Sequence, residues 1–242
     1  MASHPFLSVG FRPFYLGAAL FACLSVPLWV VGYTTGTGIS ATFPAFDWHV
    51  HEMLFGFAPA VMVGFLLTAV RNWTGLPTLS AGGLAALFAL WIAGRVGDLI
   101  APGSILSALV DLSFLPIAAC ALALPLWRAR NVRNSFVVGI LLLLFLANMA
   151  FYGAGFGWLP AAARGVAQVT ALNLIAVLMV IIGGRVIPAF SANAIESLQP
   201  KRWPALESLA VGLMVLIALV DLLMPLMMTR SALGHTGRPL RA

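Results

Sequence analysis

Four residues that can bind a metal stand together at the beginning of a long apolar segment. They are His49, His51, Glu52 and Met53 of WHVHEM, and no charged residue occurs from position 53 to position 70. With about 3.6 residues per helical turn, His49 and His51 point about 200° apart and cannot bind one metal together. His49 shares a helix face with Glu52 and Met53, a mixed donor set that copper or haem iron could use.

A second interpretation of the same residues needs no metal. Asp47 would cap the helix, Glu52 would favour the positive end of the helix dipole, and both histidines would lie in the wet interface of the membrane. Histidine is the commonest metal ligand, but only two histidines stand together here. On spacing alone, both interpretations stay open.

The composition is that of an integral membrane protein. Hydrophobic residues make up 62% of the chain and charged residues 8%, whereas about a quarter of the residues in a soluble domain are charged. The thirteen basic residues are scattered at the ends of apolar segments, which favours topology signals over a nucleic-acid surface. We therefore expect the lipid bilayer, and no nucleic acid, as a partner.

The apolar segments predict an all-α, polytopic transmembrane bundle of about seven spans. We expect one domain over residues 1–242. Its predicted spans are 14–33, 48–70, 81–101, 104–127, 135–152, 164–190 and 205–228, with a polar tail at 229–242.

Polar residues inside the predicted spans suggest a second class of function. Arg95 and Asp98 are three residues apart, so we expect them to pair on one helix face. Together with Asp111 and Asp221 they could line the path of a membrane transporter or channel-like protein without a redox cofactor.

The Gly-rich segment 152–160 is expected to be a loop.

The loop charges predict an orientation. Basic residues occur in alternate loops, at Arg12, at Arg71, in the 128–134 segment and at positions 201 and 202, whereas the intervening loops hold only Arg164. The positive-inside rule then predicts a cytoplasmic N-terminus and an outer position for the two adjacent histidines. A seventh span would place the basic tail outside, against this rule.

Seven segments, in the same order, resemble signature segments of the NnrS family. They are GFRPFYL (10–16), the block 48–75 that begins WHVHEM, AGRVGDL (93–99), VDLSFLP (110–116), RARNVRN (128–134), GGRVIPAFSANA (183–194) and MTRSALGHTGRPL (228–240). The resemblance implies a bacterial inner-membrane protein that contains haem and copper and takes part in the response to nitric oxide and nitrosative stress. Its ligand would be nitric oxide or a nitrosyl species, and a redox reaction on that ligand is an open question.

The resemblance also implies a set of site residues. The metal ligands would come from His49, His51, Glu52, Met53 and His235, and the haem or an anion would also contact Arg71 and Arg185. A guanidinium forms bidentate hydrogen bonds with a carboxylate such as a haem propionate. On the predicted topology, Arg71 and Arg185 lie toward the cytoplasmic side, so we expect no single cofactor to contact both arginines and the two adjacent histidines.

The chain is short for the family it resembles. Members of that family typically have about twelve membrane helices, and an internal deletion of about five spans would explain both the length and the conflict in charge. A second copy or a partner chain could then supply missing helices. A truncated subunit or remnant is accordingly the third interpretation.

Overall fold

The computed structural model of the chain is almost entirely helical, with 84% of residues in helices. It describes residues 5–235 except 102, 196–198, 200 and 202, and no strand occurs among them. For residues 225–235 only the course of the backbone is described. Seven helical segments of the described chain are long and apolar enough to cross a membrane. The predicted all-α bundle of about seven spans is therefore confirmed.

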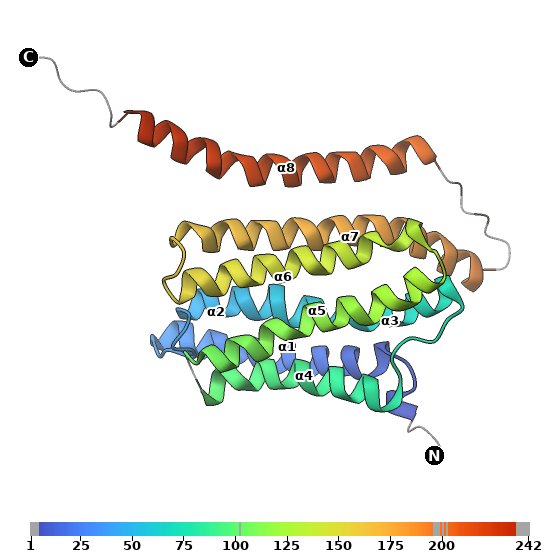
Figure 1. The fold of residues 1–242 in the computed structure, drawn as a ribbon, viewed down its shortest axis with the longest axis horizontal. Coiled ribbons are helices and arrows are strands. Elements are labelled where there is room, and N and C mark those ends of the chain that lie inside the picture. The colour runs from blue at the N-terminus through green and yellow to red at the C-terminus, as the bar shows by residue number, and fades with distance from the viewer. Residues whose placement is uncertain (1–4, 102, 196–198, 200, 202, 236–242) are drawn as a thin grey trace, which may run out of the picture. The chain divides into compact units, whose positions relative to one another are not determined.

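The helices follow one another along the chain (Figure 1). In order they are η1 (Pro5–Leu7), α1 (Phe11–Thr35), α2 (Ala45–His51), η2 (Glu52–Phe57), α3 (Ala58–Thr74), α4 (Ala81–Ile100), α5 (Ile105–Arg128), η3 (Val132–Asn134), α6 (Phe136–Gly155), α7 (Ala162–Ala194) and α8 (Pro204–His235). The second membrane span, Ala45–Thr74, runs without a break through α2, η2 and α3.

Three helix ends differ from the sequence-based expectation. Helix α6 continues to Gly155, so the loop predicted at 152–160 begins only at residue 156. Helix α7 continues past Pro188 to Ala194, beyond the predicted end at residue 190, and α8 continues through His235 into the predicted tail. Proline is tolerated within membrane helices because neighbouring groups satisfy the freed backbone carbonyl.

The chain divides into two compact units, Met1–Gln168 and Val169–Ala242. The first contains α1 to α6 and the beginning of α7, and the second contains the rest of α7 and α8. The expectation of one domain over residues 1–242 stays a prediction.

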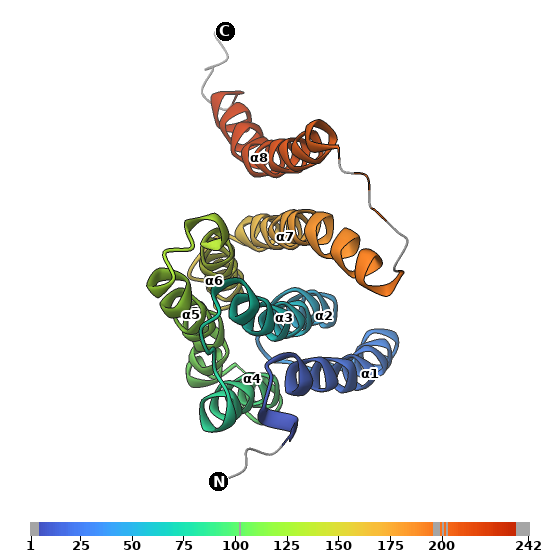
Figure 2. The same ribbon diagram turned by 90° about the vertical axis from the view of Figure 1, so that its right-hand side faces the viewer.

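Helix α3 lies in the middle of the first unit. It packs against α1 and α5, and α5 also packs against α4 and α6 (Figure 2). Small residues permit this close packing, because a Cβ added to Gly64 of α3 would lie 2.7 Å from Cβ of Phe14 in α1. Such contacts are typical of membrane helices, whose association depends on close packing because lipid is as apolar as their side chains.

Helix α1 has an exposed apolar face of the kind that contacts lipid. Leu16, Leu20 and Leu24 recur every four residues and are 61% to 64% exposed. Exposed leucines at this spacing form an apolar stripe along the helix. This surface fits the hydrocarbon of a bilayer.

Candidate functional site

A buried polar cluster joins the helices of the first unit near one end of the bundle. Its members are His51 and Glu52 at the junction of α2 and η2, Arg95 of α4, Asp111 of α5 and Asn148 of α6, and none is more than 7% exposed. Each lies roughly five to seven residues from the nearer end of its span, or about 7 to 11 Å at about 1.5 Å per residue. The cluster therefore lies at one common depth.

Arg95 is the cation at the centre of this cluster. Its Nη1 donates a hydrogen bond to Oε2 of Glu52 over 2.6 Å, and its Nη2 forms an ion pair with Asp111. The predicted pair of Arg95 with Asp98 is wrong, because Asp98 instead accepts a hydrogen bond from Thr42 over 3.3 Å. The guanidinium reaches across to two neighbouring helices and so pairs with two carboxylates at once.

Both ring nitrogens of His51 face oxygen atoms of the protein. Nδ1 lies 3.1 Å from Oε1 of Glu52, and Nε2 lies 3.0 Å from Oδ1 of Asn148 and 3.5 Å from Oδ2 of Asp111. The amide of Asn148 is oriented by its Nδ2, which donates to Asp111 over 3.1 Å. Both ring nitrogens of His51 are therefore already engaged by protein oxygens, whereas a metal ligand needs a free nitrogen lone pair.

Aromatic rings enclose the imidazole of His51. The ring centroids of Phe43, Phe55, Phe151 and Tyr152 lie 4.9 to 5.5 Å from it, and Phe43 is stacked on it. An apolar shell of this kind lowers the local dielectric and strengthens the charged hydrogen bonds inside it.

The helix that carries Glu52 has one π-helical turn, η2, directly after His51. At its end the amide of Ala58 donates to the carbonyl of Met53, five residues before it. The carbonyl of Gly56 accepts a hydrogen bond from Nε1 of Trp91 over 3.0 Å. A π turn inside an α-helix frequently marks a functional site, and this one lies beside the buried charges.

Gly56 also makes room for the central cation. A Cβ at this position would lie 2.5 Å from Nη1 of Arg95. Gly94 of α4 makes room for Asp111 of α5. A Cβ at Gly94 would lie 2.9 Å from Oδ1 and 3.0 Å from Cα of Asp111. The two glycines therefore allow the three helices to approach closely enough for the ion pairs to form.

His49 has different surroundings from His51. Its ring stacks on Trp29 of α1, with centroids 4.0 Å apart and an interplanar angle of 17°. Nδ1 of His49 is buried, and no described residue gives it a hydrogen-bond partner. The same holds for Nε1 of Trp29 and for Oγ of Ser25, one helical turn earlier on α1. His49 therefore keeps a ring nitrogen that can bind a ligand.

The structure does not assemble the donor set expected from His49, Glu52 and Met53. Both carboxylate oxygens of Glu52 are engaged by His51 and Arg95, and Met53 is half-buried. The expected spacing assumed regular α-helix, whereas the π turn begins at Glu52. Among the described residues, no group of three or more His, Cys, Asp or Glu side chains could hold a metal ion.

The other residues expected to contact a cofactor lie elsewhere. Arg71 is exposed at the opposite end of the second span, twenty residues or about 30 Å along the helix from His51. Arg185 is half-buried in the second unit, where it lines an open pocket of about 660 Å³ between α7 and α8. His235 is the last residue of α8, and its side chain lies outside the described part of the structure.

Asp47 does not cap its helix as expected. Helix α2 begins at Ala45 after Pro44, without a side-chain cap, and Asp47 lies in its first turn. There Asp47 forms an ion pair with Arg164 at the beginning of α7. Asp47 therefore pairs with a side chain of another helix and does not cap its own helix.

Sequence reasoning identified the members of the buried cluster separately but did not bring them together. Arg95 and Asp111 were placed on a possible transport path, and Asn148 was not given a role. The sequence does hold a signal, because these residues lie at similar distances from the ends of their spans at one side of the bundle. Polar residues at one depth in neighbouring membrane spans are expected to find one another, since each is costly when unpaired.

Comparison with protein families gives one match. The sequence model of the NnrS protein family matches residues 5–226. The match contains every member of the buried cluster and ends before His235. Comparisons with curated proteins and with solved structures gave no match. With most of its length matched, the chain belongs to the NnrS family.

Proposed function

We propose that this protein is a haem- and copper-containing protein of the bacterial inner membrane that binds nitric oxide or a nitrosyl species during nitrosative stress. Membership of the NnrS family supports this function at the level of the family. We also propose a cytoplasmic N-terminus. Arg12, Arg71 and the basic segment 128–133 lie at or beside helix ends on one side of the first unit, opposite the end that holds the buried cluster.

The observation that carries the haem proposal is the buried, unpartnered Nδ1 of His49. Haem iron needs only one or two axial ligands from a protein, so a single available imidazole fits it. The stacked indole of Trp29 would fix the orientation of that imidazole. Bound haem would supply an iron centre for a diatomic ligand, and His51 would act through the buried cluster and not as a ligand.

Copper has weaker support. The described residues gather no three-residue set of His, Cys, Asp or Glu that could hold it, and a protein copper site usually draws on several side chains. Copper therefore rests on the family resemblance, with Met53 and His235 as the remaining candidate donors. A second copy or a partner chain would supply further ligands.

The test is an optical spectrum with iron and copper analysis on the chain purified in detergent. We expect a Soret band that shifts when nitric oxide is added, and we expect His49→Ala to remove both the band and the iron. His51→Ala is the matched control, because it removes a neighbouring imidazole whose nitrogens face protein oxygens. Added imidazole should restore the band in His49→Ala by occupying the vacated space.

Two results would overturn the assignment. A folded wild-type chain without iron would show that this chain does not bind haem by itself. Full haem content in His49→Ala, with loss in His51→Ala, would move the axial ligand to His51 and contradict the hydrogen-bond pattern seen here.

The second candidate function is membrane transport, which the buried charges of Glu52, Arg95 and Asp111 favour. In the structure these charges are paired with one another. Asp221, which would extend a path in the second unit, accepts a hydrogen bond from Asn173 over 3.0 Å. Flux of protons or ions into vesicles that is abolished by Asp111→Asn would support transport, and a haem-free protein with such flux would replace the first proposal.

A further inference from the structure

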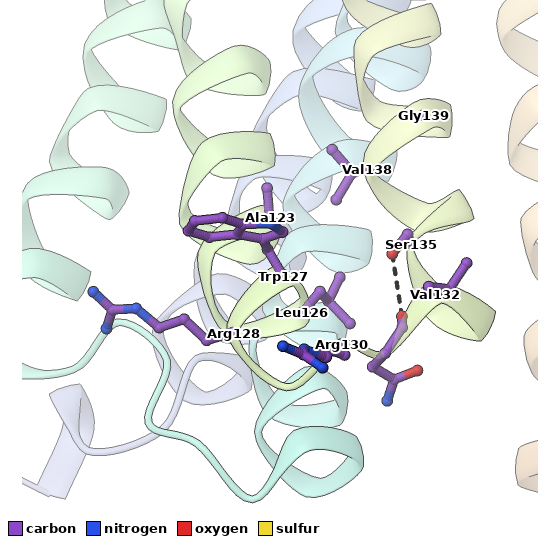
Figure 3. A pocket seen from close by; sticks show the side chains of 10 residues that line it. Ala123, Leu126, Trp127, Arg128, Arg130, Val132, Ser135, Val138 and Gly139 are labelled. Atoms are coloured by element: carbon purple, nitrogen blue, oxygen red, sulfur yellow. Dashed lines mark hydrogen bonds between the residues drawn. The ribbon is translucent and has the colours of Figure 1, made fainter.

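An open pocket of about 780 Å³ lies where α5 ends and α6 begins (Figure 3). Its apolar wall includes Ala123, Leu126 and Val138, and Arg130, Asn131 and Ser135 line its polar end. The pocket is therefore amphipathic along the direction of the helices. It lies at the end of the first unit opposite the buried polar cluster.

Arg130 takes part in an unusual helix end. The amide of Asn131 donates to the carbonyl of Leu126 over 2.9 Å, and the amide of Arg130 donates to that of Trp127 over 3.0 Å. These two bonds define a Schellman motif, in which the residue at the position of Arg130 is usually glycine. Arg130 has a φ of +50°, a left-handed conformation that disfavours a residue with a Cβ. The chain thus keeps a guanidinium at a position where glycine would fit the backbone better.

The loop that carries Arg130 is held in place by its neighbours. Nδ2 of Asn131 donates to the carbonyl of Trp73 at the end of α3 over 3.2 Å. Oγ of Ser135 donates to the carbonyl of Asn131 over 3.1 Å, as the dashed line in Figure 3 shows. The polar end of the pocket is accordingly built by fixed backbone geometry.

The charges and aromatic groups around the pocket match the headgroup region of a membrane. Its described lining residues include two arginines and no acid. Trp127 also lines the pocket and is 79% exposed, and an indole suits the membrane interface. In Figure 3 the guanidinium of Arg128 extends away from Ser135, which leaves Arg130 as the nearer cation.

We propose that this pocket binds one anionic phospholipid, with its phosphate at Arg130 and an acyl chain along the apolar wall between α5 and α6. A guanidinium binds phosphate oxygens through charge-assisted hydrogen bonds, and basic pockets between membrane helices bind acidic headgroups. A lipid is favoured over free phosphate because the apolar wall has no role for a free ion. The proposal is independent of the haem site.

The test is native mass spectrometry of the delipidated full-length chain titrated with phosphatidylglycerol or with phosphatidylcholine of the same acyl chains. We expect Arg130→Gln to weaken phosphatidylglycerol binding about fivefold, the effect of one basic residue near an anionic surface. Arg133→Gln is the matched control, since Arg133 is an exposed arginine of the same connection that does not line the pocket. It should leave binding nearly unchanged.

A third variant separates binding from folding. Arg130→Gly removes the same charge but restores the residue preferred in a Schellman motif, so its unfolding temperature should equal or exceed that of the wild type while its lipid binding falls. Equal losses for Arg130→Gln and Arg133→Gln would overturn the proposal in favour of diffuse charge. Equal binding of the two lipids, or displacement of phosphatidylglycerol by millimolar inorganic phosphate, would overturn it as well.

Discussion

Arg95 and Glu52 form a buried ion pair in which Nη1 and Oε2 are 2.6 Å apart, although the residues are separated by 43 positions in the sequence. The same guanidinium pairs with Asp111 of α5. One cation therefore pairs with two buried carboxylates, whose charges would be costly in a bilayer without a partner. The second, third and fourth spans are tied together at this point.

Replacing Arg95 by Met should destabilise the protein strongly. The change leaves Glu52 and Asp111 as neighbouring buried carboxylates, and breaking a buried ion pair typically costs about 3 to 5 kcal/mol. We expect a large fall in the unfolding temperature, as measured by circular dichroism in detergent. The exposed Arg128→Gln is the control for loss of one positive charge, and it should change that temperature little.

Part of the stability lost in Arg95→Met should return when the two carboxylates that it leaves unpaired are also replaced. Combining it with Glu52→Gln and Asp111→Asn also removes both carboxylate charges, and we expect this triple variant to recover part of the lost stability. A triple variant as unstable as the sum of its parts would show that Arg95 acts through packing and not through charge.

Gly94→Ala should destabilise the contact between α4 and α5. The added methyl would lie 3.0 Å from Cα of Asp111, so one helix must shift, and overpacking of this kind costs about 1 to 3 kcal/mol. Gly165→Ala provides the matched control, because no heavy atom lies within 4 Å of its added Cβ. The control should be neutral or slightly stabilising. Thermal unfolding of both variants distinguishes the two effects, and equal unfolding temperatures would contradict this account of Gly94.

The membrane spans could be predicted from the sequence because length and hydropathy determine them almost alone. The ends of these spans were harder to predict. The predicted span 164–190 ends two residues after Pro188, whereas α7 continues past this proline to Ala194. Local helix-breaking signals are weaker in a membrane, where unpaired backbone groups are especially costly.

The candidate site was less accessible to sequence reasoning, because its partners come from different helices. The spacing of Arg95 and Asp98 favoured a local pair, but the side chain of Arg95 instead reaches η2 and α5. The π turn at Glu52–Phe57 has no signal in its own residues, since Trp91 and Arg95 of α4 contact it. By contrast, the different surroundings of His49 and His51 follow from their spacing, which places them on different faces.

Asn148→Ala should destabilise the cluster less than Arg95→Met does. Asn148 bridges His51 and Asp111, whose nearest atoms are already 3.5 Å apart and can pair directly after a small shift. We expect a cost of about 1 to 3 kcal/mol, typical of lost buried hydrogen bonds. Iron content should stay at the wild-type level if His49 is the haem ligand. A haem-free Asn148→Ala that remains folded would instead connect the cluster directly to the cofactor.

The ion pair of Asp47 and Arg164 should link the beginning of α7 to α2. Both side chains are about one fifth exposed, so screening by water limits the coupling to about 1 kcal/mol. A double-mutant cycle with Asp47→Asn and Arg164→Gln measures this coupling free of the effects that each substitution has alone. Arg164 also lies 6.0 Å from the rings of Phe43 and Phe151, so Arg164→Gln has a cost that Asp47→Asn lacks. Strict additivity of the two substitutions in thermal unfolding would mean that the ion pair contributes no stability.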